Sequence, residues 1–248
     1  MIGKQDILER AAEWNLRPEI VEKDYALGWL LAAFASEPRT ATTWVFKGGT
    51  CLKKCFFETY RFSEDLDFSL IAGAAYTPDG LLEVVRSIAR QASELSGINF
   101  ADDKVQIVPR QDLLARPTFE GRLGYQGPLV IPTWPRVRLD ITSHERLLAP
   151  ASRRAIFHPY PDQLPAATRV STYSMEELFA EKTRALWERT RPRDFYDVTY
   201  ILTNRASEID VRAARQLFRD KCQSKGIQPP SAGRLRERVV GSAELRAD

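Results

Sequence analysis

The pattern of apolar and polar positions predicts helices in the first part of the chain. Apolar residues recur three or four positions apart in 19–36 and in 81–95, which is the spacing of one helix face. Pro18 stands where the first of these helices can begin. A shorter helix is predicted over 4–15, and another over 50–59, directly after two glycines.

Strands are predicted where apolar and polar residues alternate or where β-favouring residues cluster. The predicted strands cover 42–46, 66–71, 104–109 and 136–142. In the last of these, Val137, Leu139 and Ile141 alternate with polar residues, which is typical of a strand buried on one face. A loop is predicted over 72–80. The segment 111–132 is rich in glycine and proline and receives no assignment.

The last third of the chain has helical patterns only. Ser174 and Glu177 have the spacing of a capping box ahead of a helix over 178–189. Pro192 is placed to open the next helix, which is predicted to end near residue 204. A further helix is predicted over 211–224, and the polar tail that follows is expected to fray.

A proline-rich stretch separates the two kinds of pattern. Its prolines are Pro150, Pro159, Pro161 and Pro165. Such a composition is typical of a linker. We therefore expect an α+β chain, with an α/β domain over 1–150, a linker over 151–169 and a C-terminal helical domain over 170–248.

Composition narrows the class of protein. Of the 248 residues, 44% are hydrophobic and 28% charged, which predicts a folded globular chain. The net charge of +3 is a weak sign of a nucleic-acid partner. The beginning of the chain lacks an apolar signal segment, and the longest apolar run, 26–35, is too short to span a bilayer. We expect a cytoplasmic protein with no membrane partner.

Cysteine and histidine are too few for several kinds of site. The three cysteines form no disulfide framework and fit a reducing compartment. Cys51 and Cys55 lie four positions apart, but no second ligand pair is near them, so a structural zinc site is disfavoured. His144 and His158 are the two histidines, which argues against a histidine-based triad or metal site.

The segments around Gly48-Gly49-Thr50 and Asp65 carry the clearest chemistry. A predicted strand ends at two glycines, which permit a tight turn and close approach of a ligand. A helix then begins, and its free N–H groups and positive dipole end suit a phosphate. Asp65 and Asp67 lie two apart on the following strand, so both carboxylates share a face. They repel each other unless a cation, for which Mg²⁺ is the natural choice, lies between them.

A plain turn and a pair of solvated aspartates would each explain part of this pattern. The combination with Arg61 and Ser63 favours a ligand site. Lys47, directly before the glycines, either contacts phosphate or points to solvent. Thr50 can add a hydroxyl to the phosphate site.

Lys182 lies four positions from Leu178 and from Leu186, on or beside the buried face of its helix. A buried lysine without a partner is costly, so it needs an acid or a phosphate. The purely structural alternative is an ion pair with Asp197 or Asp194 that joins two helices.

The sequence resembles a known family at several places. Gly-Gly-Thr, a helix and then Ser-x-Asp-x-Asp are typical of the polymerase-β-like nucleotidyltransferase superfamily. The version KGGTCL…RFSEDLDFSL resembles its AbiEii/AbiGii-type toxin branch. Three further segments resemble motifs of that branch: Glu22–Tyr25, Glu181–Ala185 and Arg193–Asp197. The resemblance spans about residues 20–204, although the interval from Gly49 to Asp65 is longer than in many members of the superfamily.

The resemblance implies a polymerase-β-like core, a small mixed sheet with flanking helices, followed by a helical bundle. It implies catalysis by Asp65, Asp67, Lys182, Asp197 and Asp140. The implied metal ligands for Mg²⁺ or Mn²⁺ are Asp65, Asp67 and Asp140. The implied nucleotide contacts are Lys47, Gly48, Gly49, Thr50, Ser63 and Lys182.

Two of these roles have alternatives. Asp140 would complete the metal site or serve as base. The alternative is an exposed strand aspartate that forms a salt bridge with Arg136 or Arg138 on the same face. Asp197 would orient Lys182 or act on the attacking hydroxyl, and Asp194 has a supporting role.

The resemblance also implies a toxin that uses an NTP to modify RNA, specifically the 3′ end of tRNA, and that a cognate antitoxin neutralises. Two clusters of arginines, at 184–193 and 234–238, fit a phosphate backbone or a solvated helix face. A second possibility is a transferase that modifies a small molecule or a protein hydroxyl. A third is a nucleotide-binding module without turnover, against which the intact Asp65–Asp67 pair, with Lys182 and Asp197, argues.

Overall fold

The computed structural model describes residues 1–71, 76–112, 114–143 and 145–246. His144 and part of the predicted loop over 72–80 lie outside the described residues. The chain divides into two compact units. Unit 1 comprises Met1–Glu145 and Ser152–Thr172, and unit 2 comprises Arg146–Ala151 and Tyr173–Asp248.

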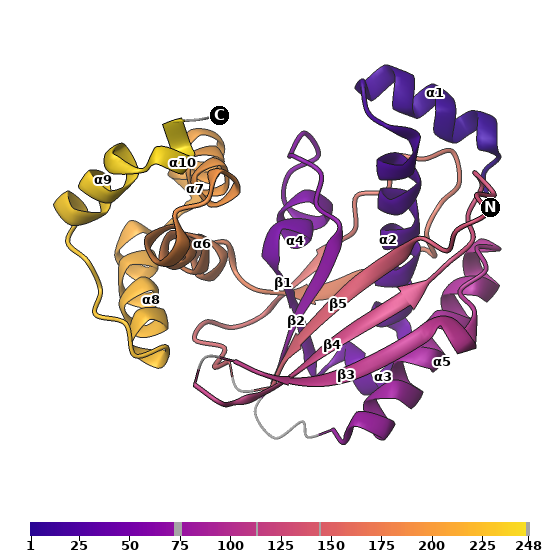
Figure 1. Cartoon of the computed structure of the whole chain (residues 1–248), viewed down its shortest axis with the longest axis horizontal. Coiled ribbons are helices and arrows are strands. Elements are labelled where there is room, and N and C mark those ends of the chain that lie inside the picture. The colour runs from indigo at the N-terminus through magenta and orange to yellow at the C-terminus, as the bar shows by residue number, and fades with distance from the viewer. Residues whose placement is uncertain (72–75, 113, 144, 247–248) are drawn as a thin grey trace. The chain divides into compact units, whose positions relative to one another are not determined.

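Within the described part of the chain, unit 1 contains a seven-stranded mixed sheet in the order β3-β4-β5-β2-β1-β7-β6 (Figure 1). Its strands are β1 (Trp44–Lys47), β2 (Asp65–Leu70), β3 (Val105–Gln111), β4 (Pro117–Gly124), β5 (Arg136–Thr142), β6 (Ser152–Ala155) and β7 (Arg169–Thr172). The central pair β2 and β5 is parallel, whereas β1 and β2 are antiparallel. This arrangement brings β2, with its two aspartates, to the middle of the sheet.

Helices of unit 1 flank this sheet. They are α1 (Lys4–Trp14), α2 (Pro18–Ser36), α3 (Pro38–Ala41), α4 (Gly48–Cys55) and α5 (Pro78–Ser96), with a short 3₁₀ turn η1 (Asp102–Lys104). Phe34 of α2 packs against Trp44 and Phe68, with ring centroids 5.5 and 4.8 Å away. Because side chains alternate along a strand, Asp65 and Asp67 project from the face of β2 opposite to Phe68.

Two helices of unit 1 differ from the predicted bounds at their starts. α4 begins at Gly48 and not at Thr50, and it ends earlier, at Cys55. α5 begins at Pro78, because Thr77 Oγ1 accepts a hydrogen bond of 3.1 Å from Gly80 N–H and caps the helix. The residues at 78–80 therefore belong to a helix and not to the predicted loop.

Strand β4 lies in the segment that the sequence left unassigned. It pairs with both β3 and β5. Its Gly121 faces the side chains of Leu139 and Ile107, and a Cβ there would lie only 3.0–3.1 Å from their atoms. The glycine that obscured the strand pattern is therefore the residue that lets three strands pack closely.

The segment 151–169, predicted to be a linker, belongs to unit 1. Ser152–Ala155 pairs with Arg169–Thr172 as a hairpin, and β7 pairs with β1. Between these strands, Phe157 N–H donates to the Lys54 carbonyl at 2.7 Å, and Tyr160 Oη donates to the Val21 carbonyl at 3.0 Å. Pro159, Pro161 and Pro165 occupy the connection between β6 and β7, where they do not interrupt strand pairing, and Pro150 precedes β6.

Unit 2 is helical. Its helices are α6 (Met175–Arg189), α7 (Pro192–Arg205), α8 (Val211–Ser224), α9 (Ala232–Gly241) and α10 (Ala243–Arg246), with a 3₁₀ turn η2 (Ala206–Glu208). Ser174 Oγ accepts from Glu177 N–H at 3.1 Å, as the capping box predicts. The Glu177 carboxylate, however, accepts from the N–H groups of Leu148 and Ala149, both at 3.0 Å.

The tail after Gly226 forms α9 and α10, where the sequence predicted a frayed end. Ser231 caps α9 by accepting from Arg234 N–H at 3.3 Å. Arg238 of α9 donates to Thr190 Oγ1 at 2.9 Å and to the Glu188 carbonyl at 3.2 Å. These bonds satisfy groups at the end of α6 and tie the tail to it. Among the described helices, none is long and apolar enough to cross a membrane.

Candidate functional site

The turn between β1 and α4 is shaped by two glycines. Gly48 has φ +81°, and a Cβ at this position would lie 2.0 Å from Asp67 Oδ2. A Cβ at Gly49 would lie 2.9 Å from Ser63 Oγ. The glycines therefore let the start of α4 approach Asp67 and Ser63 closely. Lys47, at the N-cap position, does not cap the helix with its side chain.

Three aspartates occupy the neighbouring positions of β2 and β5. Asp65 and Asp67 are both half-buried, and Asp67 lies directly opposite Asp140 in the parallel register. Burial raises the pKa of Asp140, and the negative charge of Asp65 acts in the same direction, while Arg138 opposes both. Arg138 lies 3.3 Å from the Asp140 carboxylate. The salt bridge that the sequence left open for Asp140 is therefore formed with Arg138.

Thr50 and Ser63 connect the turn to β2 in different ways. Thr50 is fully buried, and its hydroxyl donates to the Asp65 carbonyl at 2.5 Å. This bond fastens the first turn of α4 to the start of β2. Ser63, two residues before Asp65, faces Gly49. The sequence predicted both hydroxyls as nucleotide contacts, and the Thr50 hydroxyl already donates within the protein.

Lys47 forms a nearly buried ion pair with Glu145. Thr142 Oγ1 lies 3.4 Å from the Lys47 ammonium, and Ser69 Oγ donates to Glu145 at 3.3 Å. Lys47 pairs with Asp67 in the β1–β2 register, so both lie on the aspartate face. Glu145 was not predicted as a residue of the site, because it follows β5 in a segment without periodicity. Because the partner is a nearby carboxylate, Lys47 does not simply point to solvent.

The carboxylates on this face suit a hard divalent cation. Among the described residues, no group of three histidine, cysteine, aspartate or glutamate side chains is placed to hold a metal. Mg²⁺, however, is commonly bound by one or two carboxylates together with substrate phosphates. Asp65 and Asp67 on one face, beside a turn that a Cβ would fill, fit this second kind of site.

In unit 2, Lys182 Nζ lies 2.8 Å from Asp197 Oδ2. The Asp197 side chain is 0% exposed and that of Lys182 is 12% exposed. Asp194 instead accepts two hydrogen bonds from Arg189, at 2.7 and 2.8 Å. Of the two acids that the sequence left open, Asp197 is therefore the partner of Lys182. A lysine ammonium has three donors, so this pair does not exhaust it.

The two arginine clusters divide into structural and exposed residues. Arg184 pairs with Glu188, Arg189 with Asp194, and Arg238 holds the end of α6. The exposed arginines of the two clusters that take no part in these contacts are Arg191, Arg193, Arg234 and Arg236.

The Glu22–Tyr25 segment lies on α2 and contacts other parts of unit 1. Glu22 accepts from Leu129 N–H at 2.6 Å, and Asp24 forms a buried ion pair of 2.5 Å with Lys54. Lys23 pairs with the Glu64 carboxylate at 2.6 Å. These contacts give the segment a clear role in holding α2 against α4 and its neighbours.

Comparisons with known proteins agree with this architecture. The model of a family described as nucleotidyl transferase AbiEii toxin, type IV toxin–antitoxin system, matches residues 29–247. Among solved structures, the nucleotidyltransferase toxin MenT4 from Mycobacterium tuberculosis H37Rv is similar in fold, with a TM-score of 0.56 and 21% identity. The similarity covers 88% of this chain and 69% of that chain. No match was found among curated proteins.

These findings confirm the predicted fold class, a mixed sheet with flanking helices followed by a helical part. The family match covers most of the chain and includes the Gly48–Gly49 turn, both aspartate-bearing strands and the Lys182–Asp197 pair. The chain belongs to the AbiEii family and is a nucleotidyltransferase toxin of a type IV toxin–antitoxin system.

Proposed function

We propose that this toxin transfers a nucleotide from an NTP to the 3′ end of tRNA in the cytoplasm, with Mg²⁺ or Mn²⁺, and so blocks translation. The observation that carries the proposal is the approach of Asp67 to Gly48, with Asp65 on the same strand and Asp140 opposite Asp67. This combination joins a phosphate-binding helix start to a face of hard oxygen ligands.

The residues of unit 1 would divide the work as follows. The N–H groups at the start of α4, beside Gly48 and Gly49, bind the distal phosphates, and Ser63 assists. Asp65 and Asp67 hold the divalent cation, which when bound offsets the charge of the phosphates and favours ionisation of the attacking hydroxyl. Lys47, held by Glu145, contributes positive charge on the same face.

Asp140 is proposed as the residue that accepts the proton of the attacking hydroxyl. The hydroxyl oxygen forms a bond to the α-phosphorus, the bond from this phosphorus to the bridging oxygen breaks, and pyrophosphate leaves. A raised pKa makes the Asp140 carboxylate a stronger base than an ordinary aspartate. Because Asp140 lies opposite Asp67, it would also complete the metal site as a third carboxylate.

Lys182 is proposed to stabilise the charge that develops on the leaving pyrophosphate. Asp197 is fully buried and lies 2.8 Å from the Lys182 ammonium, so it is suited to orient the lysine. Its burial argues against the alternative that Asp197 acts on the attacking hydroxyl. Asp194 of α7 pairs with Arg189 at the end of α6, the helix that carries Lys182.

An RNA acceptor is supported by the exposed arginines. Four of them, Arg191, Arg193, Arg234 and Arg236, make no contact that would neutralise them among the ion pairs described above. Exposed guanidinium groups bind phosphate backbones and release counterions from them.

The experiment is to incubate the purified protein with total tRNA, Mg²⁺ and each labelled NTP in turn. Asp67→Asn and the exposed surface variant Asp103→Asn are run beside it, with EDTA in a parallel set. We expect label in tRNA with the wild type and Asp103→Asn, and none with Asp67→Asn or EDTA. If an NTP binds but no label reaches tRNA, the tRNA acceptor is wrong, and small-molecule and protein acceptors are tested next.

Type IV toxins of this family act with an antitoxin. Expression of the wild type is expected to arrest growth, and expression of Asp67→Asn is not. Growth arrest by both the wild type and Asp67→Asn would mean that toxicity does not depend on nucleotide transfer.

A further inference from the structure

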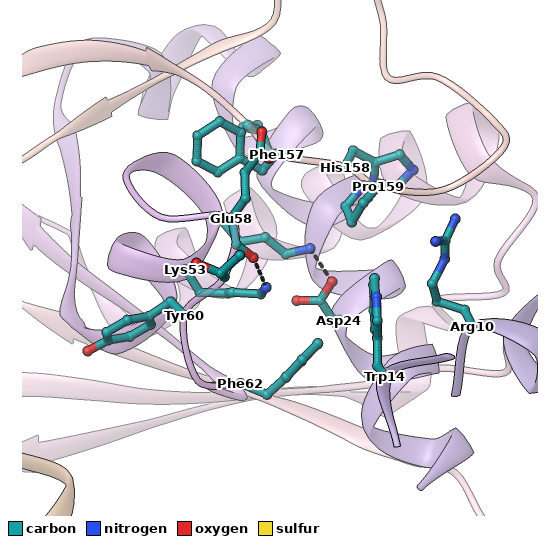
Figure 2. A pocket seen from close by; sticks show the side chains of 13 residues that line it. Arg10, Trp14, Asp24, Lys53, Glu58, Tyr60, Phe62, Phe157, His158 and Pro159 are labelled. Atoms are coloured by element: carbon teal, nitrogen blue, oxygen red, sulfur yellow. Dashed lines mark hydrogen bonds and ion pairs between the residues drawn. The ribbon is translucent and has the colours of Figure 1, made fainter. Parts of the chain in front are cut away.

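Unit 1 contains a cavity whose lining does not include the three aspartates of β2 and β5. Its volume is about 630 Å³, within the range of small-molecule sites. Residues of α1, α2, α4 and the segments 58–62 and 156–159 line it (Figure 2). It shares no residue with the proposed transfer site. α4 begins at Gly48 and reaches the cavity with Lys53 and Lys54.

One wall of the cavity is aromatic. The rings of Trp14 and Phe62 have centroids 5.4 Å apart and planes inclined by 45°. Tyr60 and Phe157 add further ring surface (Figure 2). Flat rings of this kind favour a flat ligand that stacks on them.

Two cations lie against this wall at different depths. Lys53 Nζ lies 4.6 Å from the centroid of Phe62 and donates to the Glu58 carbonyl at 2.5 Å. The Arg10 guanidinium lies 5.2 Å from the centroid of Trp14. Lys53 is 7% exposed, whereas the Arg10 side chain is 29% exposed. Arg10 also pairs with Glu13 at 2.7 Å, so its charge is partly compensated. The cavity therefore has a deep ammonium donor and an outer guanidinium.

Asp24 supplies an unmet acceptor beside the deep donor. The residue is 2% exposed, and its Oδ2 accepts from Lys54 Nζ at 2.5 Å and from Tyr160 Oη at 2.9 Å. Its Oδ1 is buried and has no hydrogen-bond partner within the described part of the chain. Figure 2 shows this second oxygen on the side of Asp24 where Lys53 lies. A buried carboxylate oxygen without a donor favours a ligand that brings one.

We propose that this cavity binds a mononucleotide with an adenine or cytosine base, at a site separate from the transferred nucleotide. The amino group of the base donates to Asp24 Oδ1, and the adjacent ring nitrogen accepts from Lys53. The base stacks on Trp14, with the inclined ring of Phe62 against its edge, and the phosphate lies at the outer end, by Arg10. Adenine and cytosine both place an amino donor next to a ring-nitrogen acceptor. Uracil has no amino group, and its ring N–H lies between two carbonyl oxygens, which the Asp24 carboxylate repels. On the Watson–Crick edge of guanine the amino group is next to a ring N–H, which leaves the Lys53 ammonium without an acceptor.

The test measures binding of AMP and CMP to the full chain by calorimetry, in EDTA. Purine riboside 5′-monophosphate, which lacks the amino group of AMP, is the matched ligand. We expect AMP to bind at least about tenfold more tightly than this analogue, because the analogue leaves Asp24 without a donor. Equal affinity of AMP and this analogue would overturn the assignment of Asp24, and binding of neither AMP nor CMP would overturn the proposal.

Variants separate this cavity from the transfer site. Trp14→Leu and Lys53→Met are each expected to weaken AMP binding about tenfold. Trp134→Leu is the matched control, because Trp134 is also half-buried and also has a lysine, Lys104, 5.8 Å from its ring. Melting curves establish that each variant is folded. Asp67→Asn is expected to leave AMP binding unchanged.

AMP binding that Asp67→Asn removes, and that Trp14→Leu leaves intact, would place the ligand in the transfer site and overturn the proposal. Failure of tRNA labelling, in contrast, would leave this result unaffected. Competition by a short RNA oligonucleotide identifies the source of the nucleotide. If the RNA displaces AMP, the natural ligand is a nucleotide within an RNA strand. If it does not, the natural ligand is a free nucleotide.

Discussion

Two groups of carboxylates, one in each unit, have opposite surroundings. In unit 2, Glu177, Asp194 and Asp197 are fully buried, and a lysine or arginine lies within 2.8 Å of each. In unit 1, Asp65 and Asp67 are half-buried on one face, and Asp140, opposite Asp67, feels the charge of Asp65.

The difference separates structural ionic groups from a ligand site. A buried acid with a cation in contact is largely compensated within the protein, and removal of one partner destabilises it. Carboxylates that crowd a half-open face are compensated best when a cation binds. The Lys182–Asp197 pair has features of a structural ion pair and of a ligand site, because Asp197 is fully buried and Lys182 is partly exposed.

The sharpest way to test this difference is Asp67→Asn. We expect the transfer rate to fall about 10⁴-fold, as for the loss of one member of a catalytic group. We expect the melting temperature to stay the same or to rise, because one of several like charges is removed. Transfer kinetics and calorimetric melting measure the two effects. A large loss of stability would mean that Asp67 is a structural residue.

Lys221→Met tests the other side of the comparison. Lys221 and Glu177 are 1% and 0% exposed and lie 2.8 Å apart. Removal of the lysine leaves a buried acid without its cation, so the free energy of unfolding should fall by roughly 3–5 kcal/mol. Denaturant unfolding measures this loss, and transfer per folded molecule should not change.

The exposed pair Arg205–Glu208 provides the control. Its removal by Arg205→Met should lower the free energy of unfolding by less than about 1 kcal/mol. An equal loss in the two variants would show that burial does not govern these ion pairs.

Gly48→Ala is expected to have a smaller effect on transfer, of about 10²-fold, because it displaces Asp67 without removing it. The new Cβ would lie 2.0 Å from Asp67 Oδ2, at φ +81°. Gly226→Ala is the control, since Gly226 also has a positive φ, +68°, but nothing within 4 Å of a Cβ. Transfer rates of both variants are measured. Equal losses would trace the effect to backbone strain and not to the displaced aspartate.

The smallest expected effect concerns pH. The pKa of Asp140 is raised above its usual 3.8. As a base, Asp140 acts only when charged, so transfer should be present above this raised pKa and decline as pH falls through it. The decline should begin at a higher pH than for an ordinary aspartate. Asp140→Asn should abolish this acid limb as well as slow the reaction, and a limb that persists in the variant belongs to another group.

Local signals in the sequence predicted many of the elements. Pro18 and Pro192 stand at the first residues of α2 and α7, and the bounds of β5 and α8 agree with those predicted. Each of these signals acts within a few residues. Glycine and proline in or near β4, β6 and β7 concealed these strands, although β4 pairs with the preceding strand β3 and β6 pairs with β7.

The same distinction applies to the candidate site. The motif around Gly48 and Asp67 predicted two segments that the fold brings into contact. No local pattern in the sequence predicts that Glu145 pairs with Lys47 or that Asp24 pairs with Lys54, because these partners are 98 and 30 positions apart. Long-range ion pairs of this kind follow from the sheet order and helix packing, which a single sequence does not state.

The return of the chain to unit 1 at Ser152–Thr172 has a consequence for how this protein is made and truncated. Until β7 has been synthesised, the β1 edge next to the Gly48 turn has unpaired backbone groups. An open edge of this kind invites pairing with another chain. A fragment that stops at Glu145 would keep Asp65, Asp67 and Asp140 and still be prone to aggregate, so a soluble fragment of unit 1 has to extend at least to Thr172.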